Sequence, residues 1–499
     1  MFRCDASPAI GAGHVMRCLA IAEAMRSAGW RIVFATGSET SATVPALAGA
    51  GFDVGVLSDD ANDADELAHR FAGGADLLVV DHYGWDASFE RACRAWARRI
   101  LVLDDATGRD HDCDLLLDAA ASEPANYRGC VPAHAHLLLG PAYATLHPKF
   151  LQQRSAALAR RGGRPVRNIL VSLGATDPMN ATCQVIDALE PLLGDASMTA
   201  VLSSRAPHLA EVQRRAQGKI TLMTDVADMA ELMSTADLAV GAAGSSAYER
   251  AALGLPTVMV TLADNQRGIC GLLAAAGAAS DAGRMDDDLA GRLRALVEGL
   301  MTDAPARIAM AKAASLLVDG RGAQRVLIAI VGETTGRDGV RVRLRLADAS
   351  DEDWLLDLQR EPGTRLYARN PAVPSAQEHA GWMRRVLADP DVELMLVEVD
   401  AEPAGMIRLD RLTGGAQGVA RYEVSIAIEA AHRNKRVASA ALRLVRSLKP
   451  VAELEAEILS ANTASVELFR RAGFAHTTGN RYRNAPVLSA TSRCQKTSS

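Results

Sequence analysis

The segment Gly11-Ala12-Gly13-His14, near the start of the chain, combines residue types that suit a catalytic site. Glycine lets a backbone turn come close to a ligand, and histidine is the side chain whose ordinary pKa lies nearest to neutrality, so it can exchange a proton there. An apolar stripe at helical spacing follows and ends near Gly29, which predicts a turn leading into a helix. An ordinary turn, with His14 capping the helix or facing solvent, is the alternative interpretation of this pattern alone.

Two more groups of polar residues follow predicted strands. Asp81-His82-Tyr83-Gly84 comes directly after the apolar run 77–80, and Asp104-Asp105 comes directly after the run 100–103. Ligands of α/β domains bind at the carboxyl ends of the strands, so both groups are candidates for a site. Structural roles stay open, because an Asp pair after a strand commonly caps a helix or anchors a loop. A catalytic and a structural role are equally compatible with His82 and Tyr83.

Two loops of small residues in the middle of the chain are suited to bind a diphosphate. The first, 172–177, follows a predicted strand, and the second, 241–246, lies between a strand and the start of a helix. Free backbone N–H groups with only small side chains around them bind phosphates without a metal ion. Glu249 lies about one turn into that helix, where a carboxylate can accept two hydroxyl protons from a ribose, although a first-turn glutamate behind a serine N-cap has the same pattern. The residues assigned to the two loops are Gly174, Ala175, Gly244, Ser245 and Ser246.

The elements that must position these residues follow an α/β rhythm, in which short apolar runs alternate with helical stretches. The rhythm is interrupted at 160–165, a charged and glycine-rich segment that we interpret as a hinge, and an α+β pattern begins after a polar stretch that starts at Gly332. Two Rossmann-like domains of an α/β protein are expected to face each other across a cleft that holds the ligand. We predict a Rossmann-like domain with the histidine over 1–155, a nucleotide-binding Rossmann-like domain over 156–331, a linker at 332–340, an α+β domain over 341–486 and a disordered tail at 487–499.

The composition is that of a globular protein without a nucleic-acid or membrane partner. The 499 residues are 49% hydrophobic and 23% charged with a formal net charge of −6, whereas nucleic-acid binding requires a clustered basic face. The sequence has no signal-like start and no apolar run near the ~18 residues that span a bilayer. Eight cysteines without a Cys-x-x-Cys pair disfavour both zinc and disulfides. We therefore expect a cytoplasmic protein with reduced thiols and no metal.

The ordered motifs of the first two thirds resemble one enzyme family. They are Arg3-x-Asp5-Ala6-Ser7, Ile10-Gly11-x-Gly13-His14-Val15-Met16-Arg17-Cys18-Leu19, Asp81-His82-Tyr83-Gly84, Asp104-Asp105 and Gly174-Ala175-Thr176-Asp177-Pro178. Over roughly residues 1–330 they are similar to the UDP-2,4-diacetamido-2,4,6-trideoxy-β-L-altropyranose hydrolases of pseudaminic acid synthesis. Three further segments, 244–249, 252–256 and 265–266, resemble the nucleotide-binding half of GT-B glycosyltransferases that use UDP-N-acetylglucosamine.

This resemblance implies a GT-B fold and hydrolysis of a sugar–UDP bond without a metal or cofactor, with inversion at the anomeric carbon. His14 is implied as the general base or the group that orients the water, with Tyr83 beside it and Asn265 reaching the substrate across the cleft. The two glycines before His14 then leave space for the sugar and the attacking water. The further residues implied to bind substrate are Asp5, Gly11, Gly13 and Arg17. A UDP-sugar-dependent glycosyltransferase with a separate acceptor is the alternative.

The last third contains an alternating strand at 421–428, followed by the segments 432–442 and 462–474. These features resemble the GNAT acetyltransferases over about 140 residues, which implies acetyl-CoA as the cofactor. Glu423, in the strand before the coenzyme loop, is the candidate base for the amine proton, with a structural role equally open. The residues implied to bind acetyl-CoA are Arg433, Lys435, Arg436, Val437, Ala438, Asn462 and Ser465.

Two residues depart from the GNAT pattern. Arg436 stands where the coenzyme loop has a glycine, so its side chain crowds the phosphates or its charge compensates for the change. Phe469 stands where many relatives have the tyrosine that protonates the leaving thiolate, and the spacing does not support Tyr482 as a substitute. The pairing of domains implies acetylation of the 4-amino UDP-sugar precursor, whose product is the hydrolase substrate. A non-catalytic coenzyme-A-binding or docking module is the alternative.

Overall fold

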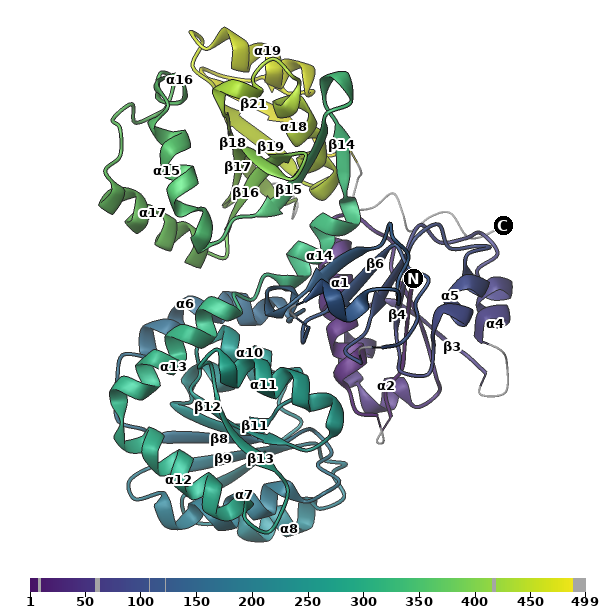
Figure 1. The fold of residues 1–499 in the computed structure, drawn as a ribbon, viewed down its shortest axis with the longest axis vertical. Coiled ribbons are helices and arrows are strands. Elements are labelled where there is room, and N and C mark those ends of the chain that lie inside the picture. The colour runs from purple at the N-terminus through teal and green to yellow at the C-terminus, as the bar shows by residue number, and fades with distance from the viewer. Residues whose placement is uncertain (8–9, 59–62, 107, 122, 415–418, 488–499) are drawn as a thin grey trace. The chain divides into compact units, whose positions relative to one another are not determined.

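The computed structural model describes residues 1–7, 10–58, 63–106, 108–121, 123–414 and 419–487 (Figure 1). The chain divides into two compact units, the first built mainly from residues up to Ala323 and the second mainly from residues after it. The first unit contains two parallel sheets and the second a mixed sheet. Within the described ranges, no helix is long and apolar enough to cross a membrane.

The first sheet is formed by the short apolar runs of the amino-terminal domain. Its strands are β1 (Phe2–Cys4), β2 (Val33–Thr36), β3 (Asp53–Val56), β4 (Leu78–Asp81), β5 (Ile100–Leu103), β6 (Leu115–Asp118) and β7 (His136–Leu139). They pair in parallel in the order β3-β2-β1-β4-β5-β6-β7. β4, β5 and β6 consist largely of leucine, isoleucine and valine. Because these side chains are apolar, the three strands can be buried along their whole length.

The helices of this domain connect the parallel strands. They are α1 (Gly13–Ser27), α2 (Thr40–Thr43), α3 (Pro45–Gly49), α4 (Asp63–Arg70) and α5 (Ala87–Cys93). α1 begins within the Gly11–His14 segment and ends shortly before Gly29, whose φ of +74° is the left-handed conformation that terminates helices. The Asp86 side chain caps α5 by accepting a hydrogen bond of 2.8 Å from the Ser88 N–H.

The second sheet repeats the parallel architecture. Its strands are β8 (Asn168–Ser172), β9 (Ser197–Leu202), β10 (Ile220–Thr224), β11 (Leu238–Ala242), β12 (Thr257–Thr261) and β13 (Ser280–Arg284), in the order β10-β9-β8-β11-β12-β13. Successive residues of β8 point to opposite faces: Ile169 and Val171 lie in one core cluster, whereas Leu170 lies in another. Each face of the sheet therefore has its own hydrophobic core.

Helices cover both faces of the second sheet, with α7, α8 and α12 on one side and α6, α10, α11 and α13 on the other (Figure 1). The helices of this domain are α6 (Pro148–Arg160), α7 (Ala181–Leu189), α8 (Leu209–Arg215), α9 (Met229–Thr235), α10 (Ser246–Ala252), α11 (Arg267–Ala275), α12 (Leu289–Thr302) and α13 (Ala304–Leu317). The next helix, α14 (Gly322–Val331), belongs to the second compact unit from Gln324 onward. α6 spans the boundary that the sequence suggested at residue 155. Phe150 and Ala157 of α6 pack in one cluster with Ala239 of β11, so the whole helix belongs to the second domain.

The third sheet is mixed. Its strands are β14 (Glu333–Thr335), β15 (Arg341–Leu346), β16 (Val392–Val399), β17 (Glu402–Leu412), β18 (Arg421–Ile428), β19 (Glu453–Glu457), β20 (Ala475–His476) and β21 (Arg481–Asn484), in the order β14-β15-β16-β17-β18-β19-β21-β20. β18 and β19 pair in parallel only from Arg421 and Glu453 to Glu423 and Glu455. Within the described residues, no further pairs join β18 and β19 beyond that point.

Helices pack on both faces of the third sheet as well (Figure 1). They are α15 (Glu352–Arg360), α16 (Pro362–Arg365), α17 (Ala376–Ala388), α18 (Val437–Leu448) and α19 (Thr463–Arg471). Leu355 of α15 and Met383 of α17 share a core cluster with Leu396 of β16. Ser375 and Glu378 form a capping box at the start of α17.

The segment 332–340, predicted as a linker, is instead largely part of this sheet. β14 pairs antiparallel with β15 through a turn in which Asp338 and Gly339 have positive φ values of 58° and 79°. The Arg337 N–H donates a hydrogen bond of 2.8 Å to the Lys435 carbonyl. Its polar composition had suggested a linker, but an edge strand needs few apolar residues because one side faces solvent. Of the predicted tail 487–499, all but Val487 lies outside the described residues.

The two parallel sheets each reverse their strand order at one point, between β1 and β4 in the first and between β8 and β11 in the second. Loops that leave such a point diverge and form the ligand site of open α/β sheets. The segments with His14 and Tyr83 follow β1 and β4, and the segments with Gly174 and Gly244 follow β8 and β11. The predicted fold class, two Rossmann-like domains followed by an α+β domain, is confirmed.

Candidate active site

His14 lies at the start of α1 and is buried, with only 6% of its surface exposed. Its Nδ1 contacts Oδ1 of Asp81, the last residue of β4. Arg17, one turn further along α1, donates to both oxygens of the same carboxylate at 2.6 Å. The residues after β1 and β4 thus form one buried cluster of an imidazole, a carboxylate and a guanidinium.

This cluster fixes the tautomer of His14. Burial by itself would raise the pKa of the Asp81 carboxyl, but Arg17 and His14 beside it hold that pKa well below its usual range. An ionised carboxylate only accepts hydrogen bonds, so the proton between the two groups belongs to Nδ1 of His14. The other ring nitrogen, Nε2, has no hydrogen-bond partner within the described part of the chain, and in the neutral form of the ring it is the nitrogen that can accept a proton.

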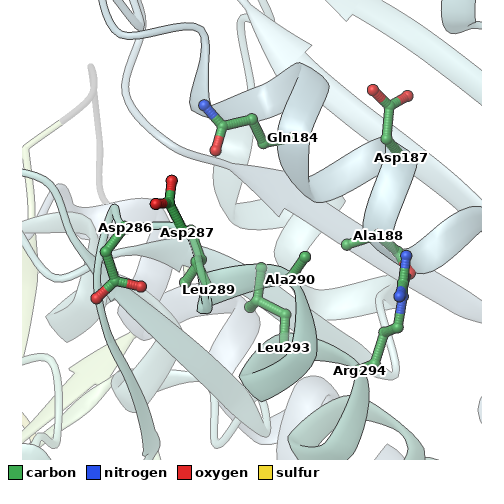
Figure 2. A pocket seen from close by; sticks show the side chains of 9 residues that line it. All are labelled: Gln184, Asp187, Ala188, Asp286, Asp287, Leu289, Ala290, Leu293 and Arg294. Atoms are coloured by element: carbon green, nitrogen blue, oxygen red, sulfur yellow. Dashed lines mark hydrogen bonds between the residues drawn. The ribbon is translucent and has the colours of Figure 1, made fainter.

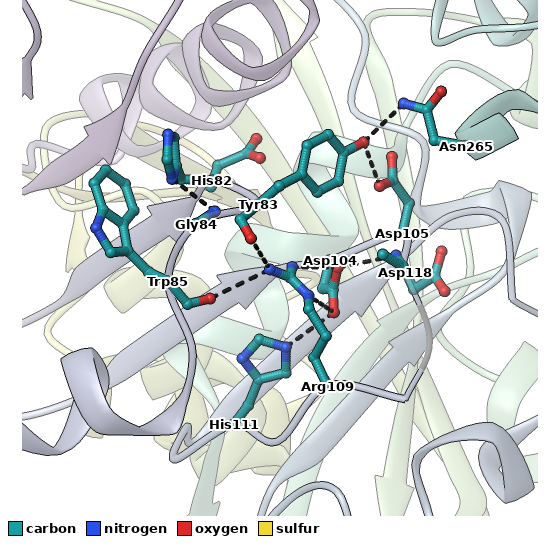
Figure 3. Close-up of polar contacts among 12 residues, drawn as sticks. His82, Tyr83, Gly84, Trp85, Asp104, Asp105, Arg109, His111, Asp118 and Asn265 are labelled. Atoms are coloured by element: carbon teal, nitrogen blue, oxygen red, sulfur yellow. Dashed lines mark hydrogen bonds and ion pairs between the residues drawn. The ribbon is translucent and has the colours of Figure 1, made fainter. Parts of the chain in front are cut away.

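Tyr83 connects the first domain to Asn265 of the second domain (Figure 3). Its ring meets the His14 ring edge to face, with centroids 4.7 Å apart. The Tyr83 hydroxyl donates to Asp105 Oδ1 at 2.6 Å and accepts from Nδ2 of Asn265 at 3.0 Å. Burial, together with the Asp105 charge, raises the pKa of Tyr83 above its ordinary value, so the hydroxyl stays protonated at neutral pH. Contacts through Tyr83 thus connect the three residues that the family resemblance implies for catalysis, His14, Tyr83 and Asn265.

The glycines before His14 face open space or the second domain. A Cβ added to Gly11, which has a φ of +77°, would meet nothing within 4 Å. A Cβ added to Gly13 would lie 3.7 Å from the Ser245 hydroxyl oxygen of the second domain. The Asp5 carboxylate, by contrast, already has protein partners. It pairs with Arg3 at 2.6 Å and accepts a hydrogen bond from the Gly37 N–H, so it connects the end of β1 to the loop after β2.

The two small-residue loops of the second domain follow β8 and β11. Gly174 has a φ of +104° and open space at its Cβ position, and the neighbouring Ala175 carbonyl accepts from Ser203 at 2.7 Å. A Cβ on Gly244 would lie 3.8 Å from the Gln266 amide nitrogen, so the second loop adjoins the segment that carries Asn265. Ser245 is exposed. Ser245 of the second loop thus adjoins Gly13 of the first domain.

Glu249 and Arg250 lie behind the second loop. Burial raises the pKa of Glu249 to about 7, and no hydrogen bond to its carboxylate is recorded among the described residues. Arg250 is completely buried and donates to the Ala242 carbonyl at 2.6 Å and to the Ser246 hydroxyl at 3.2 Å. A Cβ on Gly241 would come within 2.5 Å of the Arg250 guanidinium. Glycine is therefore required at 241, and Arg250 ties both ends of the loop.

Sequence reasoning treated Asp81 and Asp105 only as members of motifs and missed their roles as partners. Asp81 is the polar end of a fully buried strand, and a buried carboxylate has to pair with a cation or a hydrogen-bond donor. That signal was present in the sequence. The sequence left a site role and a structural role open for the aspartate pair. Asp104 has the structural role of anchoring a loop, because it binds Arg109 and His111. Asp105 instead contacts Tyr83 and Arg17.

A pocket of about 350 Å³ lies apart from these residues, on the α7 and α12 side of the second sheet (Figure 2). Two of its three acidic side chains form ion pairs: Asp187 pairs with Arg215, and Asp286 pairs with Arg292. The lining residues are Gln184, Asp187, Ala188, Asp286, Asp287, Leu289, Ala290, Leu293 and Arg294. None of the predicted site residues is among them. Over the described ranges, no group of three or more His, Cys, Asp or Glu side chains is arranged to hold a metal ion.

In the third domain, the predicted coenzyme loop leads into α18. Arg436 precedes the helix with φ 58° and ψ 19°, the left-handed conformation that glycine adopts without strain. Arg436, the residue that departs from the family pattern, therefore has a backbone conformation that favours glycine. Lys435 and Arg436 are exposed, and Val437 and Ala438 form the first turn of α18. The Arg433 side chain pairs with Glu361 at 2.8 Å and donates to the Ile428 carbonyl at 3.0 Å.

The candidate base Glu423 is occupied by a cation of the same domain. Arg369, from the segment between α16 and α17, contacts Glu423 and pairs with Glu457 at 2.6 Å. The two carboxylates flank the point where β18 and β19 stop pairing. Both carboxylates are thus paired with the same guanidinium.

The segment 462–474 forms a helix and its cap. Asn462 caps α19 by accepting a hydrogen bond of 3.1 Å from the Ser465 N–H, so these two residues have a local structural role. Phe469 is buried against Phe474, with ring centroids 4.9 Å apart. Tyr482 lies on β21 beside His476. Phe469 therefore serves as a core side chain.

Known proteins resemble the two parts of the chain separately. The chain is 29% identical over 257 residues to the spore coat polysaccharide biosynthesis protein SpsG of Bacillus subtilis, a match that covers 50% of this chain and 75% of SpsG. It is 26% identical over 254 residues to the UDP-2,4-diacetamido-2,4,6-trideoxy-β-L-altropyranose hydrolase of Campylobacter jejuni, covering 50% of this chain and 86% of that enzyme. Among solved structures, MurG of Acinetobacter baumannii gives a TM-score of 0.48 at 16% identity, covering 66% of this chain and 98% of MurG.

The acetyltransferase (GNAT) domain model matches residues 341–475. The GNAT domain of S. lividans PAT gives a TM-score of 0.26 at 22% identity, covering 30% of this chain and 93% of that domain. The mixed sheet and the positions of α18 and α19 agree with the GNAT prediction made from the sequence. The chain thus joins an N-terminal half homologous to a UDP-sugar hydrolase and to SpsG with a C-terminal GNAT acetyltransferase domain.

Proposed function

We propose that the first two domains hydrolyse UDP-2,4-diacetamido-2,4,6-trideoxy-β-L-altropyranose to UDP and the free sugar. The observation that carries this proposal is the meeting of His14, Tyr83 and Asn265, which come from both Rossmann-like domains. The homology to a hydrolase of that substrate supports the reaction class. The proposal places the sugar beside His14 and the nucleotide at the loops of the second domain.

In this proposal His14 activates the attacking water. Nε2 accepts a proton from the water while the water oxygen forms a bond to the anomeric carbon. The bond from that carbon to the diphosphate oxygen breaks, and its electron pair leaves with UDP. Asp81 holds the ring in the required tautomer and stabilises the imidazolium that results. Attack from the side opposite UDP inverts the configuration at the anomeric carbon.

The second domain stabilises the leaving group. UDP is already a good leaving group, so the remaining requirement is to bind its developing negative charge and to hold the ribose. The backbone N–H groups near Gly174 and Gly244 are suited to the diphosphate, and Glu249 has a carboxylate without a protein partner for the ribose hydroxyls. We propose that this reaction requires neither a metal nor a cofactor.

Incubation of the protein with the diacetamido UDP-sugar, followed by NMR, tests this function. Hydrolysis yields UDP and the free sugar without any added acceptor, and the first anomer to appear reports inversion. A glycosyltransferase, the alternative function, would release UDP only when an acceptor sugar or lipid is present. Absence of UDP release with and without acceptors would contradict both.

We further propose that the GNAT domain binds acetyl-CoA and acetylates the 4-amino group of the corresponding UDP-sugar precursor. The amine nitrogen forms a bond to the thioester carbonyl carbon, the carbon–sulfur bond breaks, and the proton that the nitrogen loses is balanced by the proton that converts the leaving thiolate to the thiol of coenzyme A. The family match and the left-handed loop before α18 support coenzyme binding. The product of this reaction is the proposed hydrolase substrate, so the two reactions are consecutive.

Calorimetry with acetyl-CoA, followed by a free-thiol assay with the 4-amino UDP-sugar, tests this second proposal. Binding with thiol release that depends on the sugar supports acetyl transfer. Binding without turnover supports the alternative, a coenzyme-A-binding or docking module, which the buried Phe469 and the Arg369–Glu423 ion pair favour. No binding of acetyl-CoA would contradict both.

A further inference from the structure

Tyr83 lies in the short loop between β4 and α5, and its hydroxyl needs a fixed position to reach both Asp105 and Asn265. The hydrogen bond from the Gly84 N–H to the His82 side chain, 2.9 Å long, is local and does not tie this loop to another element. The backbone of the loop is held from outside by Arg109, which comes from the segment after β5 (Figure 3).

Arg109 donates hydrogen bonds to the backbone of this loop on both sides of Gly84. Its Nη1 donates to the Tyr83 carbonyl at 2.7 Å and to the Trp85 carbonyl at 3.3 Å. Its other nitrogens donate to the two carboxylate oxygens of Asp104, at 3.2 Å and 2.5 Å. A planar guanidinium can make these contacts together, whereas an ammonium group lacks the forked geometry.

Asp104 is held in turn by a buried imidazole. Its carboxylate accepts from Nε2 of His111 at 2.9 Å, and Nδ1 of His111 donates to Glu90 of α5 at 2.7 Å. Both ring nitrogens donate to carboxylates, so the geometry requires the imidazolium form. Glu90, His111, Asp104 and Arg109, here called the Arg109 network, therefore alternate in charge from α5 back to the Tyr83 loop.

The adjacent residues Asp104 and Asp105 hold Tyr83 at its two ends. Asp105 accepts from the phenolic hydroxyl, while Asp104 acts on the backbone through Arg109. We propose that Arg109 is a positioning residue that sets the Tyr83 hydroxyl for its contact with Asn265 and substrate, with His111 fixing Asp104. This inference rests on the proposed hydrolysis, since it assigns Tyr83 to the reacting site.

The Arg109→Lys variant tests this role, because it keeps the charge and loses the fork. We expect kcat for UDP release to fall by about 10- to 100-fold, the size of effect that a small misplacement of a reacting group produces, with KM changed less than about twofold. In a Tyr83→Phe background the same change should cost less than about twofold, because the hydroxyl that Arg109 positions is already absent. Equal losses in both backgrounds, or a wild-type kcat for Arg109→Lys, would overturn the proposal.

Arg94→Lys is the matched control. Arg94 also pairs with two carboxylates, those of Asp112 and Asp114, and donates to the Asp112 carbonyl, but among the described residues it has no hydrogen bond or ion pair with the Tyr83 loop. Both variants should lower thermal stability, and only Arg109→Lys should lower kcat. A comparable fall in kcat for Arg94→Lys would mean that the loss reflects general destabilisation.

Hydrogen exchange gives a readout that does not depend on turnover. Arg109→Lys should raise amide exchange of peptides that cover 82–86 at least several-fold, whereas Arg94→Lys should leave them unchanged. Unaltered exchange in Arg109→Lys would overturn the positioning role. If the wild-type protein releases no UDP from its sugar nucleotide, the proposed function fails, while the exchange result still decides whether Arg109 holds this loop.

Discussion

Asn265, in the loop after β12, donates a hydrogen bond of 3.0 Å to the hydroxyl of Tyr83, in the loop after β4, although the two residues are 182 positions apart in the chain. The same hydroxyl donates to Asp105. Tyr83 therefore has its donor and its acceptor capacity used, one by each Rossmann-like domain. This contact joins the loop beside the proposed base to the domain that carries the proposed nucleotide loops.

Removal of this contact should slow UDP release. We expect Tyr83→Phe and Asn265→Ala each to lower kcat by about 10- to 100-fold, since each loosens the alignment of sugar and water. The double variant should lose little more than the worse single variant, because both changes delete one shared hydrogen bond. Steady-state kinetics checks this, with Tyr422→Phe in the GNAT domain as the control. Fully additive losses would contradict a shared role.

Replacement of His14 should have the largest effect on chemistry. His14→Gln removes the basic nitrogen, and we expect kcat to fall by about 10²- to 10⁴-fold, while UDP still binds at the second domain. Asp81→Asn should also lower kcat, because an amide in that position can select the wrong tautomer of His14. His134→Asn, at an exposed histidine, is the control. Wild-type UDP release by a folded His14→Gln variant would refute the assigned role.

Binding of the ribose should depend on the ionisation of Glu249. Burial raises the pKa of this carboxyl to about 7, so it is largely protonated at pH 6 and largely ionised at pH 8. The ionised form accepts two hydroxyl protons, and uridine affinity should therefore rise between pH 6 and pH 8. Uridine is the probe because it has no phosphate that titrates in this range. Calorimetry should show no such rise for Glu249→Gln, and an identical rise would exclude Glu249 as its source.

The Arg109 network should make stability sensitive to alkaline pH. Burial lowers the pKa of His111, but hydrogen bonds and charges from Asp104 and Glu90 outweigh it and raise the pKa from 6.5 to about 9. Because the folded pKa is the higher one, the stabilisation is complete below pH 6.5 and is lost as the pH rises through about 9. It amounts to about 3 kcal/mol. Denaturant unfolding at pH 7 and 10 should show this loss in the wild type and not in His111→Asn.

The left-handed backbone at Arg436 should make glycine the more stable residue. Arg436→Gly should raise the free energy of unfolding of the GNAT domain by about 1 kcal/mol, because a side chain is strained at a φ of 58°. Arg436→Ala is the control, since it removes the same charge and keeps the strain. Thermal unfolding compares the two, and equal stabilities would contradict strain at this residue. A fall in acetyl-CoA affinity common to both variants would measure the effect of the charge.

The sequence by itself determined the order of most helices and strands and the positions of the candidate site segments around His14 and Gly244. Periodicity located most of the strands, because a buried parallel strand is a short apolar run and its pattern is local. The glycines before His14 and the small residues around Gly244 were readable for the same reason, since each loop requires special residues within a few positions. High polarity was a poorer guide at the edge strand β14, because the polar composition of residues 332–340 suggests a linker and the structure has a paired strand there.

Only the tertiary structure decided which side chains meet. Arg109 was unremarkable in the sequence, because its partners are the Tyr83 and Trp85 carbonyls and a carboxylate five residues away. The hydrogen bond between Tyr83 and Asn265 depends on how two separate sheets present their loops to each other. Such contacts arise from the packing of distant segments, and neither helical nor strand periodicity encodes the direction of one polar side chain in a loop.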